Sequence, residues 1–212
     1  MRRLIPQHSL VFMMALIRFS ECAPTPWKNG LGQTWEFALE PTSERVCGFR
    51  WRLSRARIEQ TCAFSSYPGV RRWLALASGG ALELRINQRP PELLERVGQW
   101  LRFDGADAVE SVPLDGVVED FNLMIGDPAL DAEMLHRPLL GSMILVPEAG
   151  TITVLHLLSG EAQLQGSPTR RMTSADTLII RGDQPDARIE RVVGSGDVLM
   201  VRIFPGHPDV RF

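Results

Sequence analysis

Histidine, the side chain that most often binds transition metals in proteins, is scarce in this sequence. The four histidines are His8, His136, His156 and His207, and no two of them are close together in the chain. A divalent metal needs three or four nitrogen or oxygen ligands that converge on one point, and this spacing does not supply them. We therefore predict no metal and no other cofactor. His156 lies in an apolar run, which is typical of a hydrogen-bonded core or pocket histidine.

Cysteine is also scarce and unpaired. The chain has three cysteines, Cys22, Cys47 and Cys62, and no CxxC motif. The odd number argues against a closed disulfide framework, and no neighbouring residue suggests an activated catalytic thiol. Reduced thiols are typical of a cytoplasmic protein, which is the location that we expect.

The sequence has no apolar run long enough for a transmembrane helix. The stretch 10–17 follows two arginines and superficially resembles a signal peptide. It is short, however, and no small-x-small cleavage site follows it. We expect residues 1–13 to be a leader or an overlong start, with Met13 or Met14 as the biological start.

Neither sign of charge is in large excess, because 23 basic and 25 acidic residues give a net charge of −2. We expect no broad attraction to nucleic acid or to an anionic membrane, and predict neither as a partner. Three sequence motifs are missing as well: the phosphate-binding P-loop, the dinucleotide-binding GxGxxG and the GxSxG nucleophile elbow.

Helical periodicity is rare, whereas short apolar or alternating runs separated by Gly, Pro and Asp are abundant. Residues 34–39 and 50–58 alternate in the way that half-buried strands do. This pattern predicts an all-β sandwich or barrel. Few helices are expected. The best short candidate is Pro91–Arg96, and Asp127–Arg137 is a loop or short helix that marks the halfway connection.

Two glycine-containing turns have similar surroundings. Residues 72–77 and 81–86 flank Ser78-Gly79-Gly80, which predicts a β-hairpin because glycine adopts the positive φ that tight turns need. Residues 157–163 repeat this style around Ser159-Gly160. Two related β units that pack together are therefore plausible.

Three polar segments stand out between the apolar runs. Pro26–Thr34 is a turn that enters a strand, although a turn alone requires neither Trp27 nor Lys28. Phe64–Arg72 brings arginines to the mouth of a strand. An arginine there suits a carboxylate, because its planar fork binds two oxygens, but surface arginines beside a hairpin explain the pattern equally well.

The third segment is the strand-like run 117–124. Alternation places Asp120 and Asn122 on the same face. That face is either the solvent side of a sheet or the lumen of a closed barrel, where small ligands bind. The pattern alone does not separate these two readings.

Four motifs in this order resemble the HutD/Ves family, most strongly between Ala15 and Met124. They are Trp27-Lys28-Asn29-Gly30 with Gly32, Thr34 and Glu36; Trp51-Arg52-Leu53-Ser54 with Ala56; Phe64-Ser65 with Pro68-Gly69 and Arg72; and Asp120-Phe121-Asn122-Leu123-Met124. The resemblance implies a double cupin, or bicupin, of two packed jelly-roll-like β units that lack the metal ligands. We expect an N-terminal unit over 14–135 and a C-terminal unit over 136–212.

The family is associated with histidine-utilisation operons and, in its Ves branch, with stress induction. The resemblance therefore implies a small-molecule-binding, regulatory protein whose ligand is a small carboxylate of the urocanate or formylglutamate type. In this hypothesis Lys28 and Arg72 hold the carboxylate, and the other polar side chains orient the ligand. The predicted site residues are Trp27, Lys28, Asn29, Glu36, Ser54, Phe64, Arg72, Asp120 and Asn122.

Two further hypotheses stay open. A metal-independent enzyme, an isomerase or hydrolase of a small polar acid, would use Asp120 or Glu36 with Lys28 as an acid–base pair. A structural β protein would instead associate, for example as a homodimer, through exposed strand edges. We favour binding over catalysis.

Overall fold

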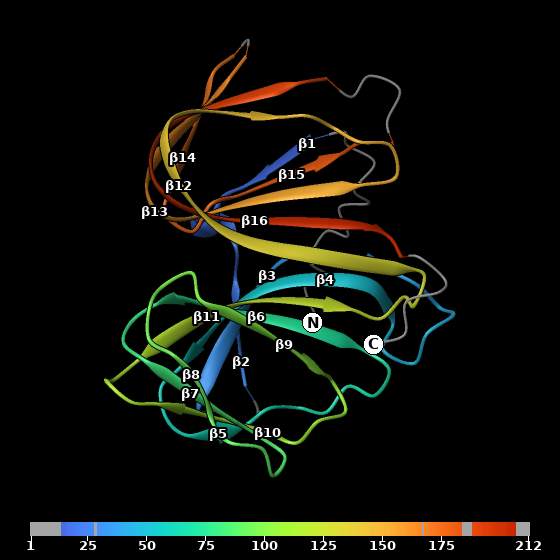
Figure 1. Cartoon of the computed structure of the whole chain (residues 1–212), viewed down its shortest axis with the longest axis vertical. Coiled ribbons are helices and arrows are strands. Elements are labelled where there is room, and N and C mark those ends of the chain that lie inside the picture. Colours follow the sequence, from blue (N-terminus) through green and yellow to red (C-terminus); the bar gives the residue numbers. More distant parts are fainter. Residues whose placement is uncertain (1–13, 28, 167, 184–187, 207–212) are drawn as a thin grey trace, which may run out of the picture.

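The computed structural model describes residues 14–27, 29–166, 168–183 and 188–206. These residues form three antiparallel sheets, and their one helical element is a short 3-10 turn, η1 (Phe19–Glu21) (Figure 1). The predicted all-β class is thereby confirmed. The predicted leader, residues 1–13, lies outside the described residues.

We name the three sheets the C-terminal, middle and outer sheet. The C-terminal sheet has the order β1-β15-β13-β16-β12 with β14 on β13, and consists of β1 (Met14–Ile17), β12 (Leu130–Leu145), β13 (Ile152–Gln165), β14 (Arg170–Thr173), β15 (Thr177–Arg181) and β16 (Glu190–Pro205). The middle sheet has the order β2-β3-β4-β11-β6-β9, and consists of β2 (Pro24–Pro26), β3 (Gly32–Pro41), β4 (Phe49–Ile58), β6 (Arg71–Ser78), β9 (Trp100–Asp104) and β11 (Val118–Ile125). The outer sheet has the order β5-β10-β7-β8, and consists of β5 (Cys62–Ala63), β7 (Leu82–Ile86), β8 (Glu92–Leu94) and β10 (Val109–Pro113).

The middle sheet is covered on both faces. One core cluster joins it to the C-terminal sheet and includes Phe121 and Leu123 of β11. A second cluster joins it to the outer sheet and includes Val118 of the same strand. Alternate residues of β11 therefore face different layers. This explains why the strand is almost entirely buried, as is typical of doubly covered strands, although it carries Asp120 and Asn122.

The predicted hairpin around Ser78-Gly79-Gly80 is wrong. β6 pairs with β9 and β11 in the middle sheet, whereas β7 pairs with β8 and β10 in the outer sheet. Gly79 has a φ of +94°, and a Cβ atom there would lie 2.4 Å from the Val117 carbonyl oxygen. The turn thus packs against the start of β11 and carries the chain from one layer to the next.

The similar turn at Ser159-Gly160 is not a hairpin either. β13 runs through it, with a register shift against β16 between Leu157 and Ser159 and a φ of +86° at Gly160. The local residues that predict a turn here produce a bulge in a long strand.

The two helix candidates are strands in the structure. Residues 92–94 form β8 on β7, and residues 130–145 form β12, which pairs with β16 along its whole length. Pairing with a distant strand overrides the weak local preference. Pro138 is tolerated within β12 because this strand is at the edge of its sheet.

Strand pairing differs from the predicted units in two places. β1 pairs with β15 of the C-terminal sheet, so Met14–Ile17 does not join the sheets of the N-terminal half (Figure 1). The predicted boundary between 135 and 136 falls inside β12. The division into units stays a prediction, and hydrogen bonding groups β1 and all of β12 with the C-terminal strands.

Candidate functional site

Neighbouring strands of the middle sheet bring most predicted site residues to one face. Asn122 on β11 lies opposite Ser54 on β4, and Ser54 lies opposite Glu36 on β3. Directly opposed residues of antiparallel strands point to the same side of the sheet. Asp120 shares this side by alternation, as does Val118, which packs toward the outer sheet. The solvent-face reading is therefore wrong, because the polar face of β11 lies between two layers.

Arg72, Asn122 and Asp120 form a chain of hydrogen bonds on this face. Nη2 and Nε of Arg72 donate to Oδ1 of Asn122 over 3.2 and 3.4 Å, and Nδ2 of Asn122 donates to Oδ1 of Asp120 over 3.2 Å. Arginine only donates, so the Asn122 amide must present its oxygen to Arg72 and its nitrogen to Asp120. The exposed fractions are 7% for Arg72, 5% for Asn122 and 1% for Asp120.

Two aromatic rings hold the Arg72 guanidinium. Its carbon lies 5.0 Å from the centre of the Phe64 ring and 4.9 Å from that of Phe103. Burial is the main cause that lowers the pKa of Arg72 to about 10; Asp120 opposes the shift, and the charge of Arg52 adds a smaller lowering. The Arg72 guanidinium therefore stays charged at neutral pH, and the positive charge of Arg52 repels it.

Asp120 is the most perturbed carboxyl group of this cluster. Burial raises the pKa of Asp120 to about 6, although the hydrogen bond from Asn122 and the charge of Arg72 oppose the rise. Its Oδ2 atom is buried and has no hydrogen-bond partner among the described residues. A charged oxygen without a donor is costly in a protein interior.

An ion pair between Arg52 and Glu36 forms the rim of the cluster of Arg72, Asn122 and Asp120. Nε of Arg52 donates to Oε2 of Glu36 over 2.7 Å, and Glu36 is exposed. Arg52 and Phe103 were not among the predicted site residues. A signal for Arg52 existed, because it alternates with Ser54 on one strand; Phe103 is brought in only by the pairing of β9 with β6.

The turn that precedes β3 has a structural role. The Trp27 indole donates to Oγ1 of Thr34 over 2.8 Å, and a Cβ atom on Gly32 would lie 2.9 Å from the Trp27 ring. Asn29 is exposed, and its Oδ1 accepts the Leu31 amide hydrogen over 3.1 Å, which closes the turn on itself. The Oδ1 atom of Asn29 therefore already has a hydrogen-bond partner within its own turn. Lys28, predicted to bind the carboxylate, lies outside the described residues.

A second polar cluster lies on the opposite face of the middle sheet. Arg55 pairs with Glu119 over 2.7 Å, and its Nη1 lies 3.3 Å from Nε2 of buried His156. Since arginine donates, Nε2 accepts, and Nδ1–H donates to Oγ1 of Thr177 over 2.9 Å. Burial and the Arg55 charge hold the pKa of His156 well below its usual value. This confirms His156 as a hydrogen-bonded core histidine.

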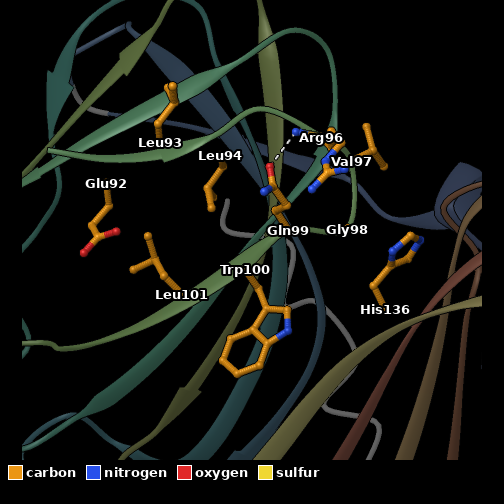
Figure 2. A pocket seen from close by; sticks show the side chains of 10 residues that line it. All are labelled: Glu92, Leu93, Leu94, Arg96, Val97, Gly98, Gln99, Trp100, Leu101 and His136. Atoms are coloured by element: carbon orange, nitrogen blue, oxygen red, sulfur yellow. Dashed lines mark hydrogen bonds between the residues drawn. The ribbon is translucent and has the colours of Figure 1, made fainter.

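A surface groove of about 650 Å³ lies elsewhere, between the β8–β9 segment and β12. Figure 2 shows the His136 side chain, from β12, beside Gly98. Trp100 lies with Gly98 on the β8–β9 side of the groove. None of the predicted site residues lines it. The groove and the Arg72 cluster are therefore separate features.

Similar proteins identify the family of this chain. A family model described as HutD matches residues 20–200. The chain belongs to the HutD family. This HutD-family chain is 29% identical over 171 residues to a 21.2 kDa protein from the hutC 3′ region of Pseudomonas putida, covering 80% of this chain and 88% of the relative. Protein Ves of Escherichia fergusonii is 32% identical over 99 residues, which is 46% of this chain and 50% of Ves.

Solved structures agree with the predicted bicupin. HutD from Pseudomonas fluorescens SBW25 has a TM-score of 0.76 at 24% identity, covering 92% of this chain and 100% of that one. The Escherichia coli pirin YhhW, solved in complex with nickel(II), has a TM-score of 0.64 at 13% identity, covering 92% and 100%. The double-cupin fold of this HutD-family chain is thereby confirmed.

In the part of this HutD-family chain that the structure describes, no three His, Cys, Asp or Glu side chains come together where an ion would be held. Both ring nitrogens of His156 are already engaged by Arg55 and Thr177. The same part of the chain contains no helix that is long and apolar enough to cross a membrane.

Proposed function

We propose that this chain is a cytoplasmic, regulatory binding protein for a small carboxylate linked to histidine utilisation, of the urocanate or formylglutamate type. One observation carries the proposal: a charged arginine, Arg72 of β6, lies against the rings of Phe64 and Phe103 on the face of the middle sheet that carries Asp120 and Asn122. Its hydrogen bonds to Asn122 use Nε and Nη2, and Nη1 donates to no acceptor among the described residues. A guanidinium presented in this way suits a carboxylate oxygen.

The electrostatics of the rim support an anionic ligand. Arg52 and Arg72 lie near enough for the first to lower the pKa of the second. A carboxylate that reaches Nη1 of Arg72 would gain a charge-assisted hydrogen bond. Phe64 and Phe103 add an apolar wall for the remainder of the ligand. The structure of HutD from Pseudomonas fluorescens SBW25 is described as that of a formate condition, and formate is the smallest carboxylate.

The test is isothermal calorimetry with urocanate, formylglutamate, histidine and glutamate. We expect dissociation constants on the order of micromolar for a preferred ligand. Arg72→Lys keeps the charge but loses the fork, and is expected to weaken binding about 10-fold. Arg85→Lys, on the exposed outer sheet, is the matched control. If none of the four compounds binds to well-folded protein, the proposal is wrong.

A metal-independent enzyme is the second candidate, because burial raises the pKa of Asp120 to about 6, close to the working range of a general base. Proton NMR of urocanate and formylglutamate incubated with the protein decides between the two, since a binding protein leaves both spectra unchanged.

The third hypothesis, a homodimer, is also still a prediction. β12 is an edge strand with exposed Leu140 and Ile144. Light scattering coupled to size-exclusion chromatography measures the mass directly, and a monomer across the accessible concentration range contradicts the dimer.

A further inference from the structure

We propose that Asp120 selects ligands that carry an N–H group, by accepting a hydrogen bond from that group at Oδ2. The inference rests on the proposed carboxylate binding at Arg72 and adds a second requirement to it. The ligand class becomes a carboxylate with an N–H donor, such as an imidazole or an amide, rather than any small acid.

The direction of the hydrogen-bond chain leads to this requirement. Arg72 donates to Oδ1 of Asn122, so Nδ2 of Asn122 must face Asp120 and donate to its Oδ1. Each link is thereby fixed by the one before it. The Asp120 carboxylate has one oxygen committed as an acceptor, and its second oxygen is the end of the chain.

Oδ2 of Asp120 makes no hydrogen bond with any of the described residues. The residues opposite Asp120 on the two flanking strands are Ala56 on β4 and Leu76 on β6, and neither side chain carries a polar hydrogen. Buried carboxylate oxygens in proteins are nearly always hydrogen-bonded. An exception beside a buried arginine therefore points to a partner that the described residues do not supply, and in this inference that partner is the ligand.

A buried acceptor discriminates strongly between otherwise similar ligands. A ligand whose N–H meets Oδ2 makes a charge-assisted hydrogen bond, whereas an isostere with an oxygen at that place brings two acceptors together. Sites that hydrogen-bond a substrate group reject analogues that lack it far more strongly than apolar pockets do. Asp120 thus determines which carboxylates bind, while Arg72 holds the carboxylate itself.

The experiment compares urocanate with 2-furylacrylate, which has the same shape but carries no N–H. Wild-type protein at pH 8 is expected to bind urocanate about 10- to 100-fold more tightly, the effect of one charge-assisted hydrogen bond. Asp120→Asn places an N–H donor at the end of the chain. The preference is expected to fall below about threefold or to reverse toward 2-furylacrylate. Asp115→Asn, on an exposed turn, is the matched control and keeps the preference.

The outcomes separate this inference from the proposed function. If wild-type protein binds both compounds with equal affinity, carboxylate binding stands and the role of Asp120 is wrong. The same holds if Asp120→Asn keeps the full preference for urocanate. If formylglutamate and both acrylates fail to bind, the proposed function fails as well.

Discussion

Replacing Asp120 by Asn should stabilise the protein at neutral and alkaline pH. Burial raises the pKa of Asp120 from 3.8 to about 6, so the folded state disfavours the charged carboxylate. A raised folded-state pKa gives stability that is fully present below the unfolded value and is lost as pH rises through the folded value. Above about pH 6 the buried charge therefore lowers the free energy of unfolding of the wild-type protein. The uncharged Asn of the variant does not have this effect.

The size of the effect follows from the shift. The difference between 3.8 and about 6 corresponds to about 3 kcal/mol, because one pKa unit is about 1.4 kcal/mol. For a chain of this length that is an increase in Tm of about 6–12 °C. The gain should be complete at pH 8, shrink between pH 6 and pH 4, and vanish below it.

Urea denaturation of the wild type and Asp120→Asn at several pH values measures this, with Asp115→Asn as the surface control. An Asp120→Asn variant that is less stable than wild type at pH 8 would refute the reasoning. It would show that the carboxylate already has a partner that offsets its charge. The N–H selection argued above would then lose its basis.

Three other changes test the neighbouring parts of the structure. Arg72→Ala removes a buried partner from between two rings and should cost about 3 kcal/mol of stability in urea denaturation, so binding is better probed with Arg72→Lys. His156→Phe should destabilise the protein by about 1–3 kcal/mol at pH 8, because Arg55 and Thr177 lose a partner. The depressed pKa of His156 favours the fold above its unfolded value, so wild type, unlike His156→Phe, should lose about 1.4 kcal/mol per unit as pH falls below about 6.5. Gly32→Ala places a Cβ atom 2.3 Å from the Arg57 carbonyl oxygen and 2.9 Å from the Trp27 ring, so its melting temperature should fall by an amount that corresponds to about 1–3 kcal/mol.

Sequence patterns predicted the class of the fold well because alternation is a local property. Residues 34–39 and 50–58 are strands in the structure, within β3 and β4. Pairing between strands is not local. The turn at Ser78-Gly79-Gly80 has the composition of a hairpin, and only the contact of Gly79 with the start of β11 shows that it joins two layers.

In the candidate site, too, local alternation was predictable from the sequence and contacts between distant residues were not. Alternation correctly placed Asp120 and Asn122 on one face, and the register adds Ser54 and Glu36 to it. Sequence alone does not reveal which polar atoms already have partners. The Oδ1 of Asn29 closes its own turn, whereas Oδ2 of Asp120 does not meet a donor among the described residues. The binding roles of Asn29 and Asp120 both stay predictions, and the proposed selection of N–H donors gives Asp120 a more specific one.

The two faces of β11 carry polar clusters of opposite character, and the difference separates a structural role from a binding role. On the C-terminal side, Arg55, Glu119 and His156 satisfy one another, and both nitrogens of the histidine are engaged. A buried network of this kind stabilises one arrangement of the layers. On the outer side, the chain that begins at Arg72 ends in an acceptor without a described donor, Oδ2 of Asp120. Stability alone would favour an Asn at that position, and the proposed ligand would offset the cost of the buried carboxylate by completing the chain.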